Sequence, residues 1–243
     1  TFSHVVPRLV GTLYDAHMPP IGILLLLALD VPLTVQETAG VARVAEPVTA
    51  GVPLPKRLLT DTAKLRLYDP DGKPVPADFR VVNRWWNDAA TQVASIQWVH
   101  CGFFASVPAR GRAVYHLRTA ADEPPAPPAK LEVTPSGDDV IISTGPLRFT
   151  VHRRGPLMDG PGLSGADFLL RSDERIYKLS SWAGSELVVE EQTPAKVVLK
   201  RTGSHGWVDG KDKALDYVVR ITAYAGKSHV RLTYSIVNRQ GER

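Results

Sequence analysis

The sequence is poor in cysteine: Cys101 is the single one among 243 residues. One cysteine cannot form a disulfide within the chain, and without a second cysteine nearby there is no spacing typical of a zinc site. Cys101 lies in the apolar segment WVHCGFF at 98–104, so we predict a buried structural thiol, with His100 as a strand residue beside it. The sequence therefore predicts neither a metal site nor a cofactor.

Long hydrophobic runs are also missing. The most apolar stretch, IGILLLLAL at 21–29, ends at Asp30 and is far shorter than the ~20 residues that cross a bilayer, which excludes a transmembrane helix there. Its length suits the h-region of a secretory signal starting at Met18, although no cationic n-region precedes it. The alternatives are a buried strand or an irregular gene start. We interpret residues 1–31 as a leader or poorly structured segment, and expect an extracytoplasmic or secreted protein.

A large excess of one sign of charge is missing as well. The chain has 29 Lys and Arg against 25 Asp and Glu, a net charge of +4. No dense basic stripe occurs, so we predict no nucleic-acid partner. Residues 32–118 hold 11 basic and 7 acidic side chains, an excess of 4 that would suit an acidic polysaccharide such as pectin.

Familiar catalytic motifs are absent from the sequence. The glycine-rich segment at 155–165 lacks the GK[ST] ending of a phosphate-binding loop, and we predict a flexible loop there. There is no Gly-x-Ser-x-Gly elbow and no His-Glu-x-x-His helix. Glu190 and Glu191 are adjacent on a predicted strand, so they face opposite sides and cannot flank one glycosidic bond. We therefore predict no catalytic residue in this chain.

What the sequence does contain is a series of short β-type runs. The segment at 64–68 (KLRLY) alternates polar and apolar residues, as a half-buried strand does. Asp69-Pro-Asp-Gly72 follows with the residues of a type I turn, and a return strand begins at Lys73. Prolines at 53, 55, 74 and 76 belong at strand edges, bulges or starts, which favours a small, bent barrel over residues 32–118. The predicted strands there are 33–37, 42–44, 48–52, 64–68, 79–85, 95–104 and 113–118.

A proline-dense stretch at 119–129 (TAADEPPAPPA) is typical of a semi-rigid spacer. We predict it to be the linker to a second domain at 130–243. Strands predicted there would pack as an antiparallel sandwich, and no amphipathic helix of three turns is indicated anywhere. The fold class is therefore all-β. The predicted strands are 131–133, 140–143, 147–152, 187–191, 195–201, 216–224 and 229–237.

Several of these segments together resemble one family. Residues 33–43 (LTVQETAGVAR), 46–55 (EPVTAGVPLP), the Asp-Pro-Asp-Gly hairpin, Arg84-Trp85 and residues 95–98 (SIQW) are similar, in that order, to the exo-rhamnogalacturonan lyase and YetA-like proteins. Residues 144–151 and 217–227 resemble the central sandwich of that family. One departure is residues 87–94, inserted where the family has a tight Asp-Gly-Ser turn.

The resemblance implies an N-terminal RIFT-type barrel, a central β-sandwich that this chain need not complete, and a C-terminal α/α toroid that we expect to be absent from this chain. It implies a polysaccharide or oligosaccharide partner, and β-elimination on a uronic acid-containing chain by the whole protein. We expect the present domains to scaffold or wall the polysaccharide cleft and to be inactive alone. The alternatives are a stand-alone carbohydrate-binding module and a structural or adhesive β-protein.

Two groups of residues are candidates for sugar contact. Arg84, Trp85 and Trp86 combine a guanidinium for a carboxylate with an indole for stacking on a sugar ring. The alternative is that both indoles fill the barrel and Arg84 caps them. The segment at 203–210 (GSHGWVDG), predicted as an exposed hairpin loop, offers His205 and Trp207, with a catalytic base at His205 as a further reading.

Overall fold

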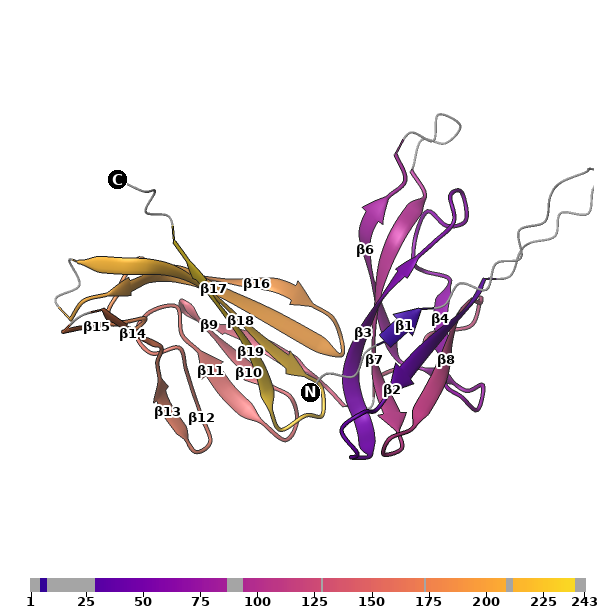
Figure 1. The fold of residues 1–243 in the computed structure, drawn as a ribbon, viewed down its shortest axis with the longest axis horizontal. Coiled ribbons are helices and arrows are strands. Elements are labelled where there is room, and N and C mark those ends of the chain that lie inside the picture. The colour runs from indigo at the N-terminus through magenta and orange to yellow at the C-terminus, as the bar shows by residue number, and fades with distance from the viewer. Residues whose placement is uncertain are drawn as a thin grey trace, which may run out of the picture. The chain divides into compact units, whose positions relative to one another are not determined.

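The computed structural model describes residues 5–7, 29–86, 94–127, 129–172, 174–208 and 212–238. All of its regular elements are β-strands, and every strand pair is antiparallel. The all-β fold class is therefore confirmed. The chain divides into two compact units, Thr1–Ala126 and Pro127–Arg243, and the division falls inside the proline-dense stretch at 119–129 (Figure 1).

Unit 1 consists of two antiparallel sheets around one core. Their strand orders are β1-β2-β8-β4-β5 and β3-β7-β6. The strands are β1 (Val5–Pro7), β2 (Asp30–Gln36), β3 (Arg43–Pro53), β4 (Leu65–Tyr68), β5 (Pro74–Val75), β6 (Ala77–Arg84), β7 (Ile96–Val107) and β8 (Arg112–Thr119).

The core of unit 1 follows from strand alternation. In β7, Val99, Cys101 and Phe103 point inward and pack with Leu33 and Leu117 from the other sheet. Burial raises the pKa of the Cys101 thiol, and the negative charge of Asp78 adds to the rise. Cys101 is thus the buried, unreactive thiol that the sequence predicts.

The turn after β4 forms as predicted. The N–H of Gly72 donates to the carbonyl of Asp69 at 3.0 Å, and Asp69 Oδ1 accepts the N–H groups of Asp71 and Lys73 at 2.9 Å each. Pro53 ends β3 and Pro74 begins β5, the positions at which a missing N–H costs least.

The predicted leader at 1–31 contributes to this fold in two places. Val5–Pro7 forms β1 and pairs with β2, and β2 itself begins at Asp30 rather than after residue 31. Leu29 and Val31 are buried, so their burial fixes the start of β2 earlier than predicted. The rest of the apolar run at 21–28 lies outside the described residues. Where the structure is described, no helix is long and apolar enough to cross a membrane.

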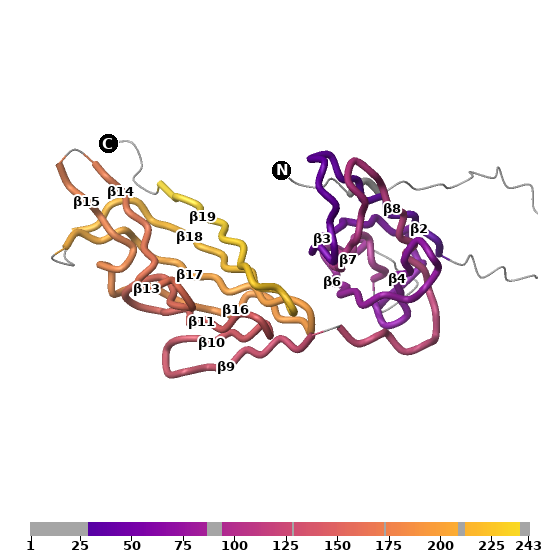
Figure 2. The backbone as a smooth tube through the Cα atoms, turned by 90° about the horizontal axis from the view of Figure 1, so that it is seen from below, coloured from indigo at the N-terminus to yellow at the C-terminus, as the bar shows by residue number. Residues whose placement is uncertain are grey.

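Unit 2 has two antiparallel sheets of five and six strands, with orders β13-β12-β11-β10-β9 and β14-β15-β17-β18-β19, β16 also pairing with β17 (Figure 2). Buried side chains from both sheets, such as Phe149 and Ile221, form one core, as in a β-sandwich. The strands are β9 (Glu132–Ser136), β10 (Asp139–Ser143), β11 (Arg148–Val151), β12 (Met158–Gly160), β13 (Leu163–Ala166), β14 (Leu169–Ser172), β15 (Arg175–Lys178), β16 (Glu186–Gln192), β17 (Lys196–Gly206), β18 (Lys213–Tyr224) and β19 (Val230–Val237).

The prediction of a flexible loop at 155–165 was wrong. Residues Met158–Gly160 and Leu163–Ala166 form the β12–β13 hairpin, which pairs with β11. The segment before the hairpin is fixed by Arg201, whose side chain is 0% exposed. Its Nη1 donates to the carbonyls of His152 and Pro156 at 3.0 and 2.9 Å, and its Nη2 donates to that of Gly155 at 2.9 Å. A buried guanidinium from a distant strand therefore orders the glycine-rich segment.

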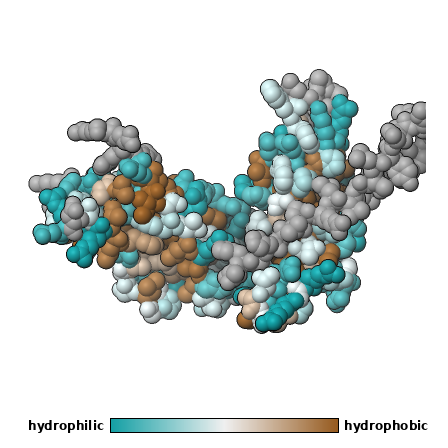
Figure 3. Space-filling view, viewed as in Figure 1, coloured by the Kyte–Doolittle hydropathy of each residue, from teal (hydrophilic) through white to brown (hydrophobic). Residues whose placement is uncertain are grey.

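The outer surface of the molecule mixes polar and apolar residues, and Figure 3 shows hydrophilic and hydrophobic side chains interspersed on its visible face. Ion pairs lie on the outer side of the six-stranded sheet. Glu190 accepts from Arg220 at 2.5 and 2.8 Å and lies 3.5 Å from Lys200. Glu191, across a β-bulge, instead pairs with Lys196 at 2.8 Å. The two acids thus have separate basic partners.

Candidate functional site

The structure places Arg84, Trp85 and Trp86 at the end of β6 in unit 1. Nη1 of Arg84 donates to the carbonyls of Thr60 and Ala94, both at 2.8 Å. Trp85 is half-buried, and its Nε1 donates to the carbonyl of Leu54 at 3.0 Å. Trp86 is 87% exposed. Arg84 and Trp85 therefore hold backbone segments together, although Arg84 is also exposed, and Trp86 is the most exposed side chain described among the three. The insertion at 87–94 is outside the described residues except for its last one.

The prediction that His205 lies at an exposed loop tip was wrong. His205 is within β17 and 0% exposed. Its Nδ1 pairs with the carbonyl of Leu215 at 2.6 Å, and its Nε2 contacts the hydroxyl of Tyr234. Burial raises the pKa of Tyr234 to about 12, and Tyr217 and Asp167 add to the rise, so this phenol remains protonated. His205 is a buried core residue that no surface ligand reaches.

Trp207 follows β17 and is half-buried. The ring of Tyr177 lies 5.8 Å from its ring, and the guanidinium of Arg175 lies 5.6 Å from the ring centre, within cation–π range. The main-chain N–H of Trp207 donates to the carbonyl of Asp212 at 2.9 Å. The ring of Trp207 therefore packs against Tyr177 and Arg175, and its main chain is hydrogen-bonded to that of Asp212.

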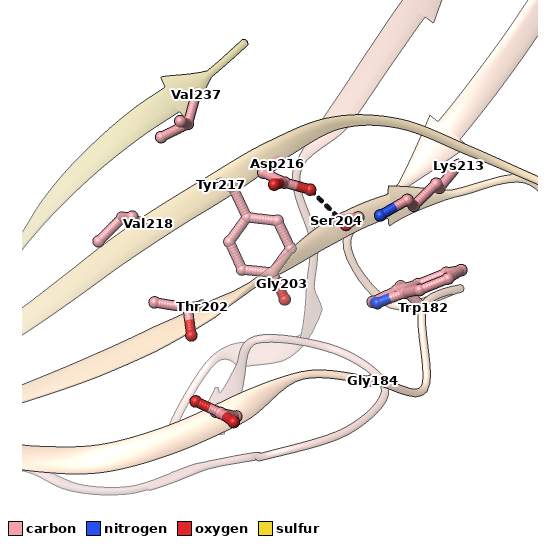
Figure 4. Close-up of a pocket in the computed structure, with 11 residues that line it drawn as sticks. Trp182, Gly184, Thr202, Gly203, Ser204, Lys213, Asp216, Tyr217, Val218 and Val237 are labelled. Atoms are coloured by element: carbon pink, nitrogen blue, oxygen red, sulfur yellow. Dashed lines mark hydrogen bonds between the residues drawn. The ribbon is translucent and has the colours of Figure 1, made fainter. Parts of the chain in front are cut away.

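A pocket of about 360 Å³ opens on the outer side of the six-stranded sheet of unit 2 (Figure 4). It combines one indole, two carboxylates, one ammonium, three hydroxyls and two valine side chains. The lining residues used below come from the β15–β16 loop and from four strands: Trp182, Glu186, Thr202, Ser204, Lys213, Asp216, Val218 and Val237.

Strand register brings the polar groups of this pocket together. Ser204 pairs with Asp216 across β17 and β18, and the Ser204 hydroxyl donates to Asp216 Oδ1 at 2.5 Å. Thr202 pairs with Val218 in the same sheet and with Glu186 of β16. Since side chains two residues apart share a face, all of these project to the outer side. The alternating pattern of β17 and β18 is thus what builds the pocket wall.

Two glycines shape the pocket from beneath. A Cβ at Gly203 would lie 2.7 Å from the Tyr217 hydroxyl, so only glycine leaves room for this ring on the core side. The Tyr217 hydroxyl and the Ser185 hydroxyl are 2.9 Å apart. A Cβ at Gly206 would lie 2.8 Å from the carbonyl carbon and oxygen of Ser181. These close approaches fix the loop that carries Trp182.

The Trp182 loop is held at its start by Asp167. Its carboxylate accepts the N–H of Ser180 at 3.1 Å and also contacts the Ser180 hydroxyl. At the other end, the Ser185 hydroxyl donates to the carbonyl of Trp182 at 3.2 Å. Lys213 Nζ lies 5.5 Å from the centre of the Trp182 ring, within cation–π range. The indole is therefore set at the rim on an ordered loop.

Several polar groups in the pocket have no partner in the part of the chain that the structure describes. Within the described residues, the Trp182 Nε1, the Glu186 carboxylate and the Thr202 hydroxyl make no hydrogen bond, and Lys213 has no ion pair. Together they offer donors, an acceptor and a hydroxyl that can act as either. Such a set beside an aromatic ring and two valines matches a polar ligand that has both hydroxyls and C–H faces.

Sequence reasoning did not find this pocket. Its one signal is the indole in SSWAGS at 180–185, a tryptophan among small residues. The other lining residues are far from it in sequence and come together through the register of β16, β17 and β18. No group of three metal-ligating residues occurs where the chain is described, so the pocket has no evident metal ligands.

A second cluster of titratable residues, His152, Asp139 and Asp159, connects strands of the five-stranded sheet of unit 2. His152 Nδ1 lies 2.8 Å from Asp139 Oδ2, and His152 Nε2 lies 2.8 Å from Asp159 Oδ2. Burial alone would lower the pKa of His152, but the hydrogen bonds to both carboxylates outweigh it and raise the pKa. With both ring nitrogens donating to carboxylates, His152 has no lone pair for base catalysis. We interpret the cluster as a structural link between β10, β11 and β12.

This cluster predicts a pH-dependent stability. The raised pKa of His152 means that its contribution is complete below its ordinary value of 6.5 and is lost as pH rises through the raised folded value. The pKa of Asp139 is lowered because bonds from His152 and the Arg153 N–H outweigh its burial, so its contribution exists above 3.8 and is lost at lower pH. Between pH 6 and pH 9, the melting temperature should fall by a few degrees more in the native chain than in His152→Gln.

The exposed His229 provides the control, since it makes no side-chain hydrogen bond or ion pair with another described residue. The variant His229→Gln should keep the native pH profile in a calorimetric scan series. If His152→Gln also follows the native profile, the imidazolium does not link the strands.

Comparison with known proteins finds two matches. Residues 172–242 match the family described as the PcRGLX-like protein central beta sandwich domain. The chain is also 26% identical, over 231 residues, to the "Uncharacterized protein YetA" of Bacillus subtilis (strain 168). That alignment covers 84% of this chain and 25% of the relative, so the chain spans about a quarter of the relative's length. Both matches support the likeness to rhamnogalacturonan lyase-like proteins, and the matched sandwich segment contains the lining residues of the pocket, from Trp182 to Val237.

Proposed function

We propose that this chain supplies the non-catalytic β-domains of a carbohydrate-active protein that resembles exo-rhamnogalacturonan lyases. In this proposal unit 1 is a RIFT-type barrel, unit 2 is the central sandwich, and both scaffold a polysaccharide-binding cleft outside the cytoplasm. The two antiparallel sheets around one core in unit 1 and the matched segment in unit 2 support it. β-Elimination would belong to the longer protein.

The observation that carries the proposal is the pocket beside Trp182. An indole face offers a sugar ring a large contact area, while the Trp182 Nε1, Glu186 and Thr202 can exchange hydrogen bonds with its hydroxyls. Polar groups that are already ordered and unpaired bind without first breaking protein contacts. The same pocket would do little in a purely structural β-protein.

Binding should be visible at the indole N–H of Trp182. In a titration with rhamnogalacturonan oligosaccharides, followed by the indole cross-peaks of a ¹⁵N-labelled chain, we expect a saturable shift of the Trp182 peak. The variant Trp182→Ala identifies that peak. Its affinity, measured by isothermal titration calorimetry, should be at least about fivefold lower, as expected for loss of a stacking anchor of about 1–3 kcal/mol.

Trp207→Ala is the matched control, because Trp207 is a half-buried indole of the same unit that does not line the pocket. It should retain the Trp182 shift. Saturable shifts confined to Trp86 would place sugar binding in unit 1 instead. The absence of a shift at every indole would favour the structural or adhesive alternative and contradict the proposal.

A further inference from the structure

The pocket beside Trp182 carries a charge pattern that bears on which sugar it takes. Glu186 and Asp216 contribute two carboxylates and Lys213 one ammonium, which leaves a net charge of −1 among the lining side chains. The ammonium lies over the Trp182 ring, at the rim. Glu186 has no basic partner among the described residues. The lining residues therefore carry more negative than positive charge, with Glu186 and Lys213 both exposed to an entering ligand.

We infer that this pocket accepts a neutral sugar residue and disfavours a uronate, an inference that rests on the proposed sugar binding. A uronate carboxylate would face the unpaired carboxylate of Glu186, and like charges at close range repel. A neutral ring offers hydroxyls that donate to Glu186 and accept from Trp182 Nε1. Val218 and Val237 add apolar contact for its C–H face.

The net negative charge of the pocket differs from the basic excess of residues 32–118. The excess of basic residues at 32–118 suggests an acidic glycan, but those residues belong to unit 1. In unit 2, Lys200 and Arg220 are engaged with Glu190, so they are not available to a uronate. A glycan that contains both kinds of sugar would thus place a neutral residue, rather than an acidic one, in the pocket of unit 2.

Two probes that differ in the group at C6, and also in the anomeric configuration of their linkages, test this inference. β-1,4-Galactotetraose and α-1,4-tetragalacturonate present similar rings, with a hydroxymethyl in the first where the second has a carboxylate. In low salt we expect galactotetraose to shift the Trp182 indole peak with at least about fivefold higher affinity, which corresponds to one repulsive contact of roughly 1 kcal/mol in water. Raising the salt should narrow the ratio by strengthening tetragalacturonate binding.

Two substitutions should change the ratio of the affinities for galactotetraose and tetragalacturonate in opposite directions. Glu186→Gln keeps the size and an acceptor oxygen but removes a negative charge, so the preference for the neutral probe should shrink. Lys213→Gln removes the one positive charge, so the preference should grow. A ratio that both variants leave unchanged would contradict the inference.

The outcomes separate this inference from the function on which it rests. If tetragalacturonate shifts the Trp182 peak as tightly as galactotetraose or more so, the pocket binds sugar but the neutral preference is wrong. If neither probe nor the rhamnogalacturonan oligosaccharides shift that peak, the sugar-binding proposal fails and this inference fails with it.

Discussion

Replacing Arg201 by methionine is expected to lower the free energy of unfolding by about 3 kcal/mol, because buried polar groups that lose a partner cost ~1–3 kcal/mol each. Methionine keeps much of the apolar stem but donates no hydrogen bond. The carbonyls of His152, Gly155 and Pro156 would each lose a donor at 2.9–3.0 Å. These carbonyls are partly accessible to water, so the cost stays below the sum of three full penalties. Chemical denaturation of the whole chain measures the change.

Arg220→Met is the matched control for this substitution. Arg220 lies on the neighbouring strand of the same sheet but projects outward, is 41% exposed and pairs with Glu190. Exposed ion pairs of this kind contribute about 1 kcal/mol or less. Equal stability losses in the two variants would mean that Arg201 does not organise the segment before β12.

The buried charge of Arg201 is stabilised by groups of unit 2 that lie close to it. Burial lowers the pKa of the Arg201 guanidinium, whereas the charges of Asp139 and Asp167 act to raise it. Its Nε is buried without a hydrogen-bond partner among the described residues. The guanidinium therefore remains in the core because its other nitrogens bind carbonyls that the sheet cannot pair.

The parts of the fold that the sequence predicted are those with local causes. The alternation at 64–68 predicted β4, the strand predicted at 216–224 covers most of β18, and the Asp-Pro-Asp-Gly turn predicted the β4–β5 connection. These features depend on neighbours within a few residues, for which turn chemistry and side-chain period are sufficient. The burial of Cys101 followed from its apolar surroundings in the same way.

The parts that could not be predicted depend on distant segments. The strands β12 and β13 are three and four residues long and rich in small residues, so no period marks them. They are ordered by β11 and by Arg201, which is 35 or more residues away in the chain. Short strands of this kind are recognised only once their partners are known.

The glycines beside His205 led to the wrong prediction of an exposed loop at the candidate site. Gly203 and Gly206 flank His205 and suggested an exposed loop, yet all three lie in β17. The glycines serve close packing instead, against the Tyr217 hydroxyl and the Ser181 backbone. The pocket itself requires the pairing of Ser204 with Asp216, a register that no local pattern specifies.

Gly206→Ala should impair both stability and sugar binding, because its new methyl group would meet main-chain atoms. The Cβ would lie 2.8 Å from the carbonyl carbon and oxygen of Ser181 and 3.0 Å from the N of Trp182. Backbone cannot rotate aside as a side chain can, so the loop must shift, at a cost of about 1–3 kcal/mol typical of overpacking. We expect a lower melting temperature, a displaced Trp182 indole peak in the free chain and weaker oligosaccharide binding.

Gly102→Ala provides the comparison, since it adds the same methyl group within β7, where the nearest atom would be 3.9 Å away. It should leave the melting temperature within about 1 °C of the native value, as expected for a substitution that changes stability by a few tenths of a kcal/mol. Its Trp182 peak should not move. A Gly206→Ala variant with the native melting temperature and an unmoved Trp182 peak would show that the loop is not positioned by this contact. The link between the Gly206 contact and the sugar pocket would then have to be abandoned, because Trp182 would reach its position without the close approach of Ser181 to β17.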